Sequence, residues 1–177
     1  LTYMLGPAEY VTNYTVTFPD GSKDDYGLAR TDDTGYAQYF FLSRRVDAQG
    51  REVQVQYEPY DPDPDHGQVV RLKQVVDADG QAMVFHYSSS HPANTNLIDR
   101  VTDPYNRTAY LSHTDWIHEK DQQTVTNQLL SLVTDVEGLA SSFTYDATDG
   151  WPTTLTTPYG TTTFNPVDAG SGHSNDR

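Results

Sequence analysis

The stretch that decides the fold is Val46–Tyr57, "VDAQGREVQVQY", because it returns along the chain with the same spacing. The segments "VDADGQAMVFHY", "TDPYNRTAYLSH" and "TDVEGLASSFTY" align with it without gaps. Self-similarity of this kind is the signature of a repeat architecture, in which each unit is one supersecondary element. The four copies begin their turns at Asp47, Asp77, Asp103 and Asp135, at spacings of 30, 26 and 32 residues.

Each copy predicts a tight turn. The fourth residue of the turn is Gly50, Gly80, Asn106 or Gly138. Aspartate at the first turn position accepts hydrogen bonds from the backbone, and glycine at the fourth supplies a positive φ. Asparagine tolerates that left-handed region better than other side chains, so the copy with Asn106 keeps the same chemistry.

Each turn leads into a strand with bulky side chains on one face. Residues eight and ten positions after the aspartate share a face because strand side chains alternate. The tenth position holds Tyr57, Tyr87, His113 and Tyr145, and the eighth holds Val55, Phe85, Leu111 and Phe143. The repeat is therefore predicted to be a β-hairpin. An isolated hairpin is marginal in water, so successive hairpins are expected to pair into a continuous, curved antiparallel sheet.

Weaker units extend the pattern in both directions. "TVTFPDGSKDDYG" predicts a hairpin around Pro19–Gly21, a further copy is suggested by Asp32, Gly35 and Phe40, and a short one follows with its turn at Gly160 and Phe164 beyond it. The predicted repeat region is residues 1–164, with units near 14–42, 43–60, 60–87, 97–113, 129–145 and 145–164. The polar segment 165–177 is expected to be a tail or boundary.

A helix competes with a hairpin only over His113–Val133. Trp116 and Leu129 fit one helical face, but Thr124, Val125 and Thr126 interrupt it with β-branched residues. We favour a long hairpin with its tip near Glu119–Gln122.

Composition supports a strand-rich fold and disfavours several functions. Twenty of the 25 acidic residues are Asp, a turn former, and the formal net charge is −14. The electrostatic field of this negative net charge repels phosphate and anionic lipid, so we expect no nucleic-acid binding and no membrane insertion. No cysteine is present, which excludes disulfides and thiolate sites. The start "LTYML" already reads as a strand, so we expect a fragment of a longer polypeptide.

A second signature joins the repeats. Tyr60-Asp61 is followed by Gly67, and Tyr145-Asp146 by Gly150, and each pair leads through an aliphatic strand toward the next turn. This alternation over residues 14–164 resembles the YD repeat of the Rhs family. The resemblance implies stacked hairpin strips of a large β-sheet shell, of the kind found in bacterial Rhs toxins, insecticidal toxin complexes and teneurins. It further implies a secreted or surface location, adjacent repeats as partners, and a toxin domain as possible cargo.

This chain departs from the family pattern in places. Gly67-Gln68 and Gly150-Trp151 stand where the family commonly has Gly followed by Arg-Leu, and His113 replaces the repeat aromatic. The self-cleaving core region and a toxin domain do not appear in the sequence. The expected function is a structural shell or scaffold module without enzymatic activity.

Two candidate binding sites compete with purely structural explanations. Asp61, Asp63 and Asp65 in "YDPDPDHG" resemble a calcium loop, but His66 occupies the glycine position and Leu72 the position of the bidentate Glu. We favour a YD turn with an Asp-Pro insertion and no required cofactor, with Ca²⁺ as the alternative. Trp116 and Trp151 lie outside the repeat register and are candidate glycan contacts, which would make the module a carbohydrate-binding or adhesion module.

Histidines and other motifs give no catalytic signal. The six histidines lack metal-site spacing, and no nucleophile elbow or P-loop is present. Aspartates are numerous, and their turn positions explain them better than a glycosidase pair does. Catalytic residues are therefore predicted to be absent.

Overall fold

The structure, a computed structural model, describes residues 1–5, 11–31, 38–60, 69–88, 96–120 and 122–165. It divides into two compact units, Leu1–Thr108 and Ala109–Arg177. All regular structure in the described part of the chain is β, which confirms the predicted fold class. Among these residues, no helix has the length and apolar character that a membrane crossing requires.

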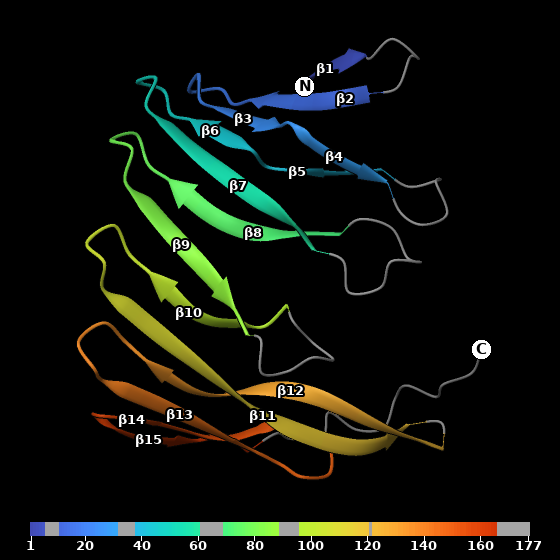
Figure 1. Cartoon of the computed structure of the whole chain (residues 1–177), viewed down its shortest axis with the longest axis vertical. Helices are drawn as coiled ribbons and strands as arrows, with labels where there is room; N and C mark the ends of the chain where they lie inside the picture. Colours follow the sequence, from blue (N-terminus) through green and yellow to red (C-terminus); the bar gives the residue numbers. More distant parts are fainter. Residues whose placement is uncertain (6–10, 32–37, 61–68, 89–95, 121, 166–177) are drawn as a thin grey trace. The chain divides into compact units, whose positions relative to one another are not determined.

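The first unit is a run of antiparallel hairpins (Figure 1). Its sheet has the order β1-β2-β3-β6-β7-β8-β9-β10, which follows the chain except where β4 and β5 pair separately. The strands are β1 (Thr2–Leu5), β2 (Val11–Thr17), β3 (Lys23–Tyr26), β4 (Leu28–Thr31), β5 (Gln38–Phe41), β6 (Arg44–Val46), β7 (Glu52–Tyr60), β8 (Val69–Val76), β9 (Ala82–Tyr87) and β10 (Ile98–Thr102).

The second unit repeats the same construction with five strands in chain order. They are β11 (Thr108–Lys120), β12 (Gln123–Thr134), β13 (Ala140–Tyr145), β14 (Pro152–Thr157) and β15 (Gly160–Thr163). β11 and β12 form the long hairpin that the sequence favoured over a helix, and its tip lies where predicted, with Gln122 at φ 65°. Phe164 follows β15, and its N–H donates to the carbonyl of Thr153 at 2.8 Å.

The strand register places apolar positions of successive repeats opposite one another. The residue eight positions after one aspartate faces the residue two positions before the next: Val55 faces Val75, and Phe85 faces Val101. In the second unit, Leu111 faces Val133 in the same way. Because facing residues project from the same side of a sheet, this register builds an apolar face in each unit.

The opposite face is polar. In the first unit, Thr15 faces Asp25, which faces Arg44, and Gln56 faces Gln74. In the second unit, Thr144 faces Thr154 and their hydroxyls are 2.6 Å apart. Side-chain hydrogen bonds therefore link neighbouring strands on the polar side, whereas the other side combines apolar contacts with the Asp24–Arg45 ion pair.

Few side chains in the described residues are buried. Tyr60 is 9% exposed, Asp24 3% and Ser88 6%, and no large side chain is fully buried. Domains usually bury an apolar face against a second layer of structure. In the first unit, the separate β4–β5 pair supplies part of such a layer, since Phe40 packs on Tyr14 and Phe41 on Tyr57, at 4.6 and 5.5 Å between ring centroids. The five described strands of the second unit form a single layer.

A β-bulge recurs at the same repeat position, in the pairing of one repeat's last strand with the next strand of the chain. The pairing of Tyr57 with Leu72 follows that of Gln56 with Gln74, which leaves Lys73 as the extra residue. The same shift occurs beside Tyr87, His113 and Tyr145. A bulge bends its strand and increases the local twist. The tenth position of the repeat therefore marks a bend in four strand pairs, β7–β8, β9–β10, β11–β12 and β13–β14.

Candidate functional site: turns, tyrosine locks and a polar hollow

The four Asp-x-x-Gly segments form turns with identical backbone hydrogen bonds. The N–H of Asp47 donates to the carbonyl of Arg51 at 2.9 Å, and the N–H of Gly50 donates to the carbonyl of Asp47 at 3.0 Å. The turns at Asp77, Asp103 and Asp135 repeat both bonds. The fourth residue has a positive φ in each: 85° at Gly50, 79° at Gly80, 62° at Asn106 and 82° at Gly138.

The aspartate side chain fixes each turn from inside. Oδ1 of Asp47 accepts the N–H groups of Gln49 and Arg51, each at 2.9 Å. The other three aspartates accept the equivalent pairs of N–H groups. At Asp47 the hydrogen bond from the N–H of Arg51 holds the pKa of the carboxyl below its ordinary value. A carboxylate that accepts backbone donors favours its charged form.

Each repeat tyrosine bonds to a backbone carbonyl fifteen residues earlier. The hydroxyl of Tyr57 donates to Leu42 at 2.9 Å, that of Tyr87 to Leu72 at 2.5 Å, and that of Tyr145 to Leu130 at 2.6 Å. Leu72 and Leu130 directly precede bulged residues, where ladder bonding is disrupted. The tyrosine hydroxyl thus supplies a donor at the bulge. Burial raises the pKa of all three hydroxyls, so they remain protonated donors at neutral pH.

Sequence reasoning missed the partner of this bond. Leucine stands five residues before the turn aspartate in three copies, as Leu42, Leu72 and Leu130, and Ile98 takes the position in the fourth. That periodic signal was available in the sequence. It did not show which backbone atom the tyrosine reaches, because the reach depends on the bulge.

Trp116 packs onto the turn that follows Tyr145. Its indole N–H donates to the carbonyl of Ala147 at 3.0 Å. A Cβ on Gly150 would lie 3.1 Å from three atoms of the indole ring, and the His118 ring stacks on the indole at 3.8 Å between centroids and 12° between planes. Gly150 and the His118 ring therefore both lie against the indole ring, which is half-buried.

Gly150 has a second constraint. Its φ is 73°, and its N–H donates to the carbonyl of Asp146 at 3.1 Å. Oδ1 of Asp146 accepts the N–H of Thr148 at 2.7 Å, and this bond lowers the pKa of the carboxyl. The YD turn therefore requires glycine both for its conformation and for the close approach of Trp116.

Trp151 and Gly160 occupy exposed positions. Trp151 is 59% exposed, and Gly160 lies at the β14–β15 turn opposite Thr157 with φ 145°. Trp151 is therefore more exposed than the half-buried Trp116. The sequence alone did not show that the two tryptophans differ in exposure.

The predicted calcium ligands Asp61, Asp63 and Asp65 lie outside the described residues, as do the weak turn residues Asp32 and Gly35. Within the ranges that the structure describes, no group of three or more His, Cys, Asp or Glu side chains is placed to hold a metal ion.

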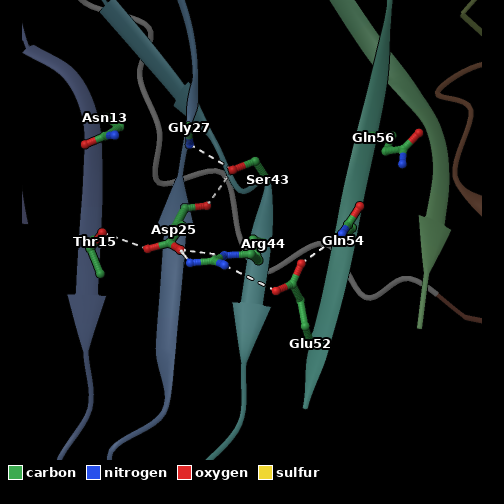
Figure 2. A pocket seen from close by; sticks show the side chains of 9 residues that line it. All are labelled: Asn13, Thr15, Asp25, Gly27, Ser43, Arg44, Glu52, Gln54 and Gln56. Atoms are coloured by element: carbon green, nitrogen blue, oxygen red, sulfur yellow. Dashed lines mark hydrogen bonds and ion pairs between the residues drawn. The ribbon is translucent and has the colours of Figure 1, made fainter. Parts of the chain in front are cut away.

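A polar hollow of about 490 Å³ lies on the first unit's sheet, across β2, β3, β6 and β7 (Figure 2). Oδ2 of Asp25 contacts the Arg44 guanidinium at 2.6 Å, and Oδ1 accepts the Thr15 hydroxyl at 2.7 Å. Arg44 also reaches Glu52 at 3.2 Å. The bond from Thr15 is the main reason that the pKa of Asp25 lies below its ordinary value.

The hollow occurs where the chain leaves the main sheet. Gly27 separates β3 from β4, and its N–H donates to the Ser43 hydroxyl at 3.0 Å, while that hydroxyl donates to the carbonyl of Asp25 at 3.1 Å (Figure 2). Ser43 therefore bonds two backbone groups at the branch point. A Cβ on Gly27 would lie 2.8 Å from the Ser43 oxygen, which explains glycine here.

An ion pair stabilises the other face of the same strands. Arg45 binds Asp24 through two hydrogen bonds of 2.6 Å, and Asp24 is almost fully buried. The bond from Arg45 holds the pKa of the Asp24 carboxyl below its ordinary value. A bidentate pair of this kind fixes geometry as well as charge. In these contacts the carboxylates and guanidinium groups serve as links between strands.

Comparison with known families locates the repeat in the second unit. Residues 125–162 match the family model described as RHS Repeat. No curated protein matches the chain. The matched segment contains the Asp135–Gly138 turn, Tyr145 with its bond to Leu130, and the Asp146–Gly150 turn. The match supports an Rhs/YD-repeat protein, in which such repeats form a structural module of antiparallel hairpins.

Proposed function

We propose that this chain is a non-enzymatic wall segment of a β-sheet shell, in a larger Rhs-type polypeptide that is secreted or displayed at the cell surface, and that the shell encloses a toxic domain. The observation that carries the proposal is a hydrogen bond that recurs in three repeats, which we call the tyrosine lock. In it, the hydroxyl of Tyr57, Tyr87 or Tyr145 donates to the carbonyl of a leucine fifteen residues earlier.

The bulges support a curved wall. Each bulge falls at one repeat position, so each bends its strand pair at an equivalent place. Repeated bends of this type are the means by which sheets acquire curvature. The large apolar side chains that stay exposed in the described residues further support assembly with additional chain, since a single layer leaves apolar surface in contact with water.

The test is electron microscopy and limited proteolysis of the polypeptide that contains these repeats. We expect a hollow particle and a C-terminal domain that resists protease until the wall is denatured. A solid or open particle, or a domain digested as fast as it is in isolation, would refute the shell role.

A second candidate function, glycan binding, is favoured by the exposed ring of Trp151. Sugar C–H groups can pack on such a ring, and Asp149, whose carboxylate accepts the N–H of Trp151 at 3.0 Å, lies beside it. Glycan-array signal that Trp151→Ala abolishes would support this function. A signal that survives Trp151→Ala, or no signal across the array, would oppose it.

A further inference from the structure

Among the strands that the structure describes, one edge of β12 is largely without a partner. β12 pairs with β11 along its length, but among the described strands it pairs with β13 only at Leu132–Thr134. The preceding residues, Gln123–Ser131, continue with β11 as a two-stranded ribbon (Figure 1). The Tyr145 hydroxyl occupies the carbonyl of Leu130. The part of β12 before Leu130 therefore presents main-chain groups with which a further strand could pair.

Gln123–Leu130 lacks the usual protection against strand addition, and the bulge of β12 comes only after it, at Ser131. Natural edges carry charged side chains, proline or bulges that discourage pairing. β12 has no charged residue and no proline in twelve positions, although 20% of the chain is charged. The β11 side of the ribbon, by contrast, carries Asp115, Glu119 and Lys120. The two edges of one ribbon thus differ in their readiness to accept a strand.

The sequence of the open edge is self-complementary. Gln123–Asn127 reads amide, Thr, Val, Thr, amide, and it is symmetric about Val125. In an antiparallel pair centred on Val125, Thr124 of one strand faces Thr126 of the other, and Gln123 faces Asn127. A two-fold interface requires this property, because the same patch must match itself.

The structure already forms both kinds of side-chain pair between facing strand residues. The hydroxyls of Thr156 and Thr161 are 3.0 Å apart, and Nε2 of Gln74 donates to Oε1 of Gln56 at 2.9 Å. Cross-strand Thr pairs and amide pairs stabilise sheets. Gln123, Thr124, Thr126 and Asn127 are all exposed. The Thr124 hydroxyl donates to Glu119 at 2.8 Å, and its oxygen can still accept a hydrogen bond from the Thr126 of a second copy.

From these observations we infer that a second copy of this chain docks on β12, through antiparallel pairing of Gln123–Asn127 about a two-fold axis at Val125. The net charge of −14 opposes association of copies elsewhere on the surface, and the uncharged strand is where two copies approach with least repulsion. The inference rests on the second unit alone and does not depend on the shell role.

Disulfide trapping tests the register. The chain has no cysteine, so Val125→Cys introduces a single thiol. Facing residues of antiparallel strands lie about 4.5–5.5 Å apart at Cα, which a disulfide can span. We expect Val125→Cys to form a covalent dimer under mild oxidation. Asn127→Cys is the matched control, because its copies would be offset by four residues, about 13 Å, and should stay monomeric.

Sedimentation equilibrium on the unmodified chain tests the association itself. We expect a concentration-dependent dimer. Thr126→Lys should raise its dissociation constant at least tenfold, whereas Thr163→Lys, on the edge strand β15, should leave the dissociation constant unchanged. A chain that is monomeric throughout, equal crosslinking of the two cysteine variants, or disruption by Thr163→Lys alone would overturn the inference. Circular dichroism of each variant confirms that it is folded.

Discussion

The hydroxyl of Tyr145 donates to the carbonyl of Leu130 at 2.6 Å, and this bond joins a repeat's last strand to the strand that precedes its turn. The two residues lie 15 positions apart in the sequence, and Leu130 directly precedes a bulged residue. The bond recurs at Tyr57 and Tyr87 with the same separation. It therefore belongs to the repeat and does not depend on one local contact.

Removing this hydroxyl should destabilise the hairpin. Tyr145→Phe keeps the ring but leaves the Leu130 carbonyl without its donor, and we expect a loss of about 1 kcal/mol. Urea unfolding followed by circular dichroism measures the change. Tyr110→Phe is the control, because Tyr110 is 54% exposed, and its substitution should change the unfolding free energy by less than about 0.5 kcal/mol. Equal effects of the two substitutions would argue against the lock.

The left-handed turn position should discriminate among side chains by conformation alone. Gly80 has φ 79°, and a Cβ there meets nothing within 4 Å. Gly80→Val should cost about 1–3 kcal/mol from backbone strain. Gly80→Asn should cost clearly less, because Asn106 occupies the equivalent position at φ 62°. Thermal unfolding of both variants provides the comparison, and unchanged stability of Gly80→Val would contradict the turn assignment.

Two glycines with similar φ should respond differently to alanine. Gly150 and Gly138 have φ 73° and 82°, but only at Gly150 would the Cβ meet Trp116, at 3.1 Å. Both substitutions carry the strain, and Gly150→Ala adds an overpacking cost of about 1 kcal/mol or more. Chemical unfolding should therefore rank Gly150→Ala as the less stable variant. The opposite order would show that the Trp116 ring moves aside without a loss of unfolding free energy.

The Asp24–Arg45 pair should make the unfolding free energy depend on pH in the acidic range. The hydrogen bond from Arg45 lowers the folded-state pKa of Asp24 below 3.8, so the folded protein favours the carboxylate. Its contribution is complete above the unfolded-state pKa and is lost as pH falls through the lower, folded-state value. Between pH 5 and pH 2.5, Asp24→Asn should show a shallower decline in unfolding free energy than the original chain. Parallel pH profiles for the two proteins would contradict this contribution.

The turns were predictable because their chemistry is local. Asp47 and Gly50 lie three residues apart, and the aspartate bonds and the positive φ involve only the turn itself. The long β11–β12 hairpin was also predictable, since β-branched residues at Thr124–Thr126 disfavour the competing helix. The different surroundings of Trp116 and Trp151 were not predictable, because the contact of Trp116 with Ala147 spans 31 residues.

By itself, the sequence determined the hairpin repeat, the positions of its turns and the alternation of apolar and polar faces, since these follow from side-chain chemistry over a few residues. Only the tertiary structure decided which carbonyl each tyrosine binds, that Trp116 covers Gly150, and that Asp24 is buried against Arg45. These contacts depend on bulges and strand register. One bulged residue shifts every later pairing, and the sequence spacing does not record which strand carries it.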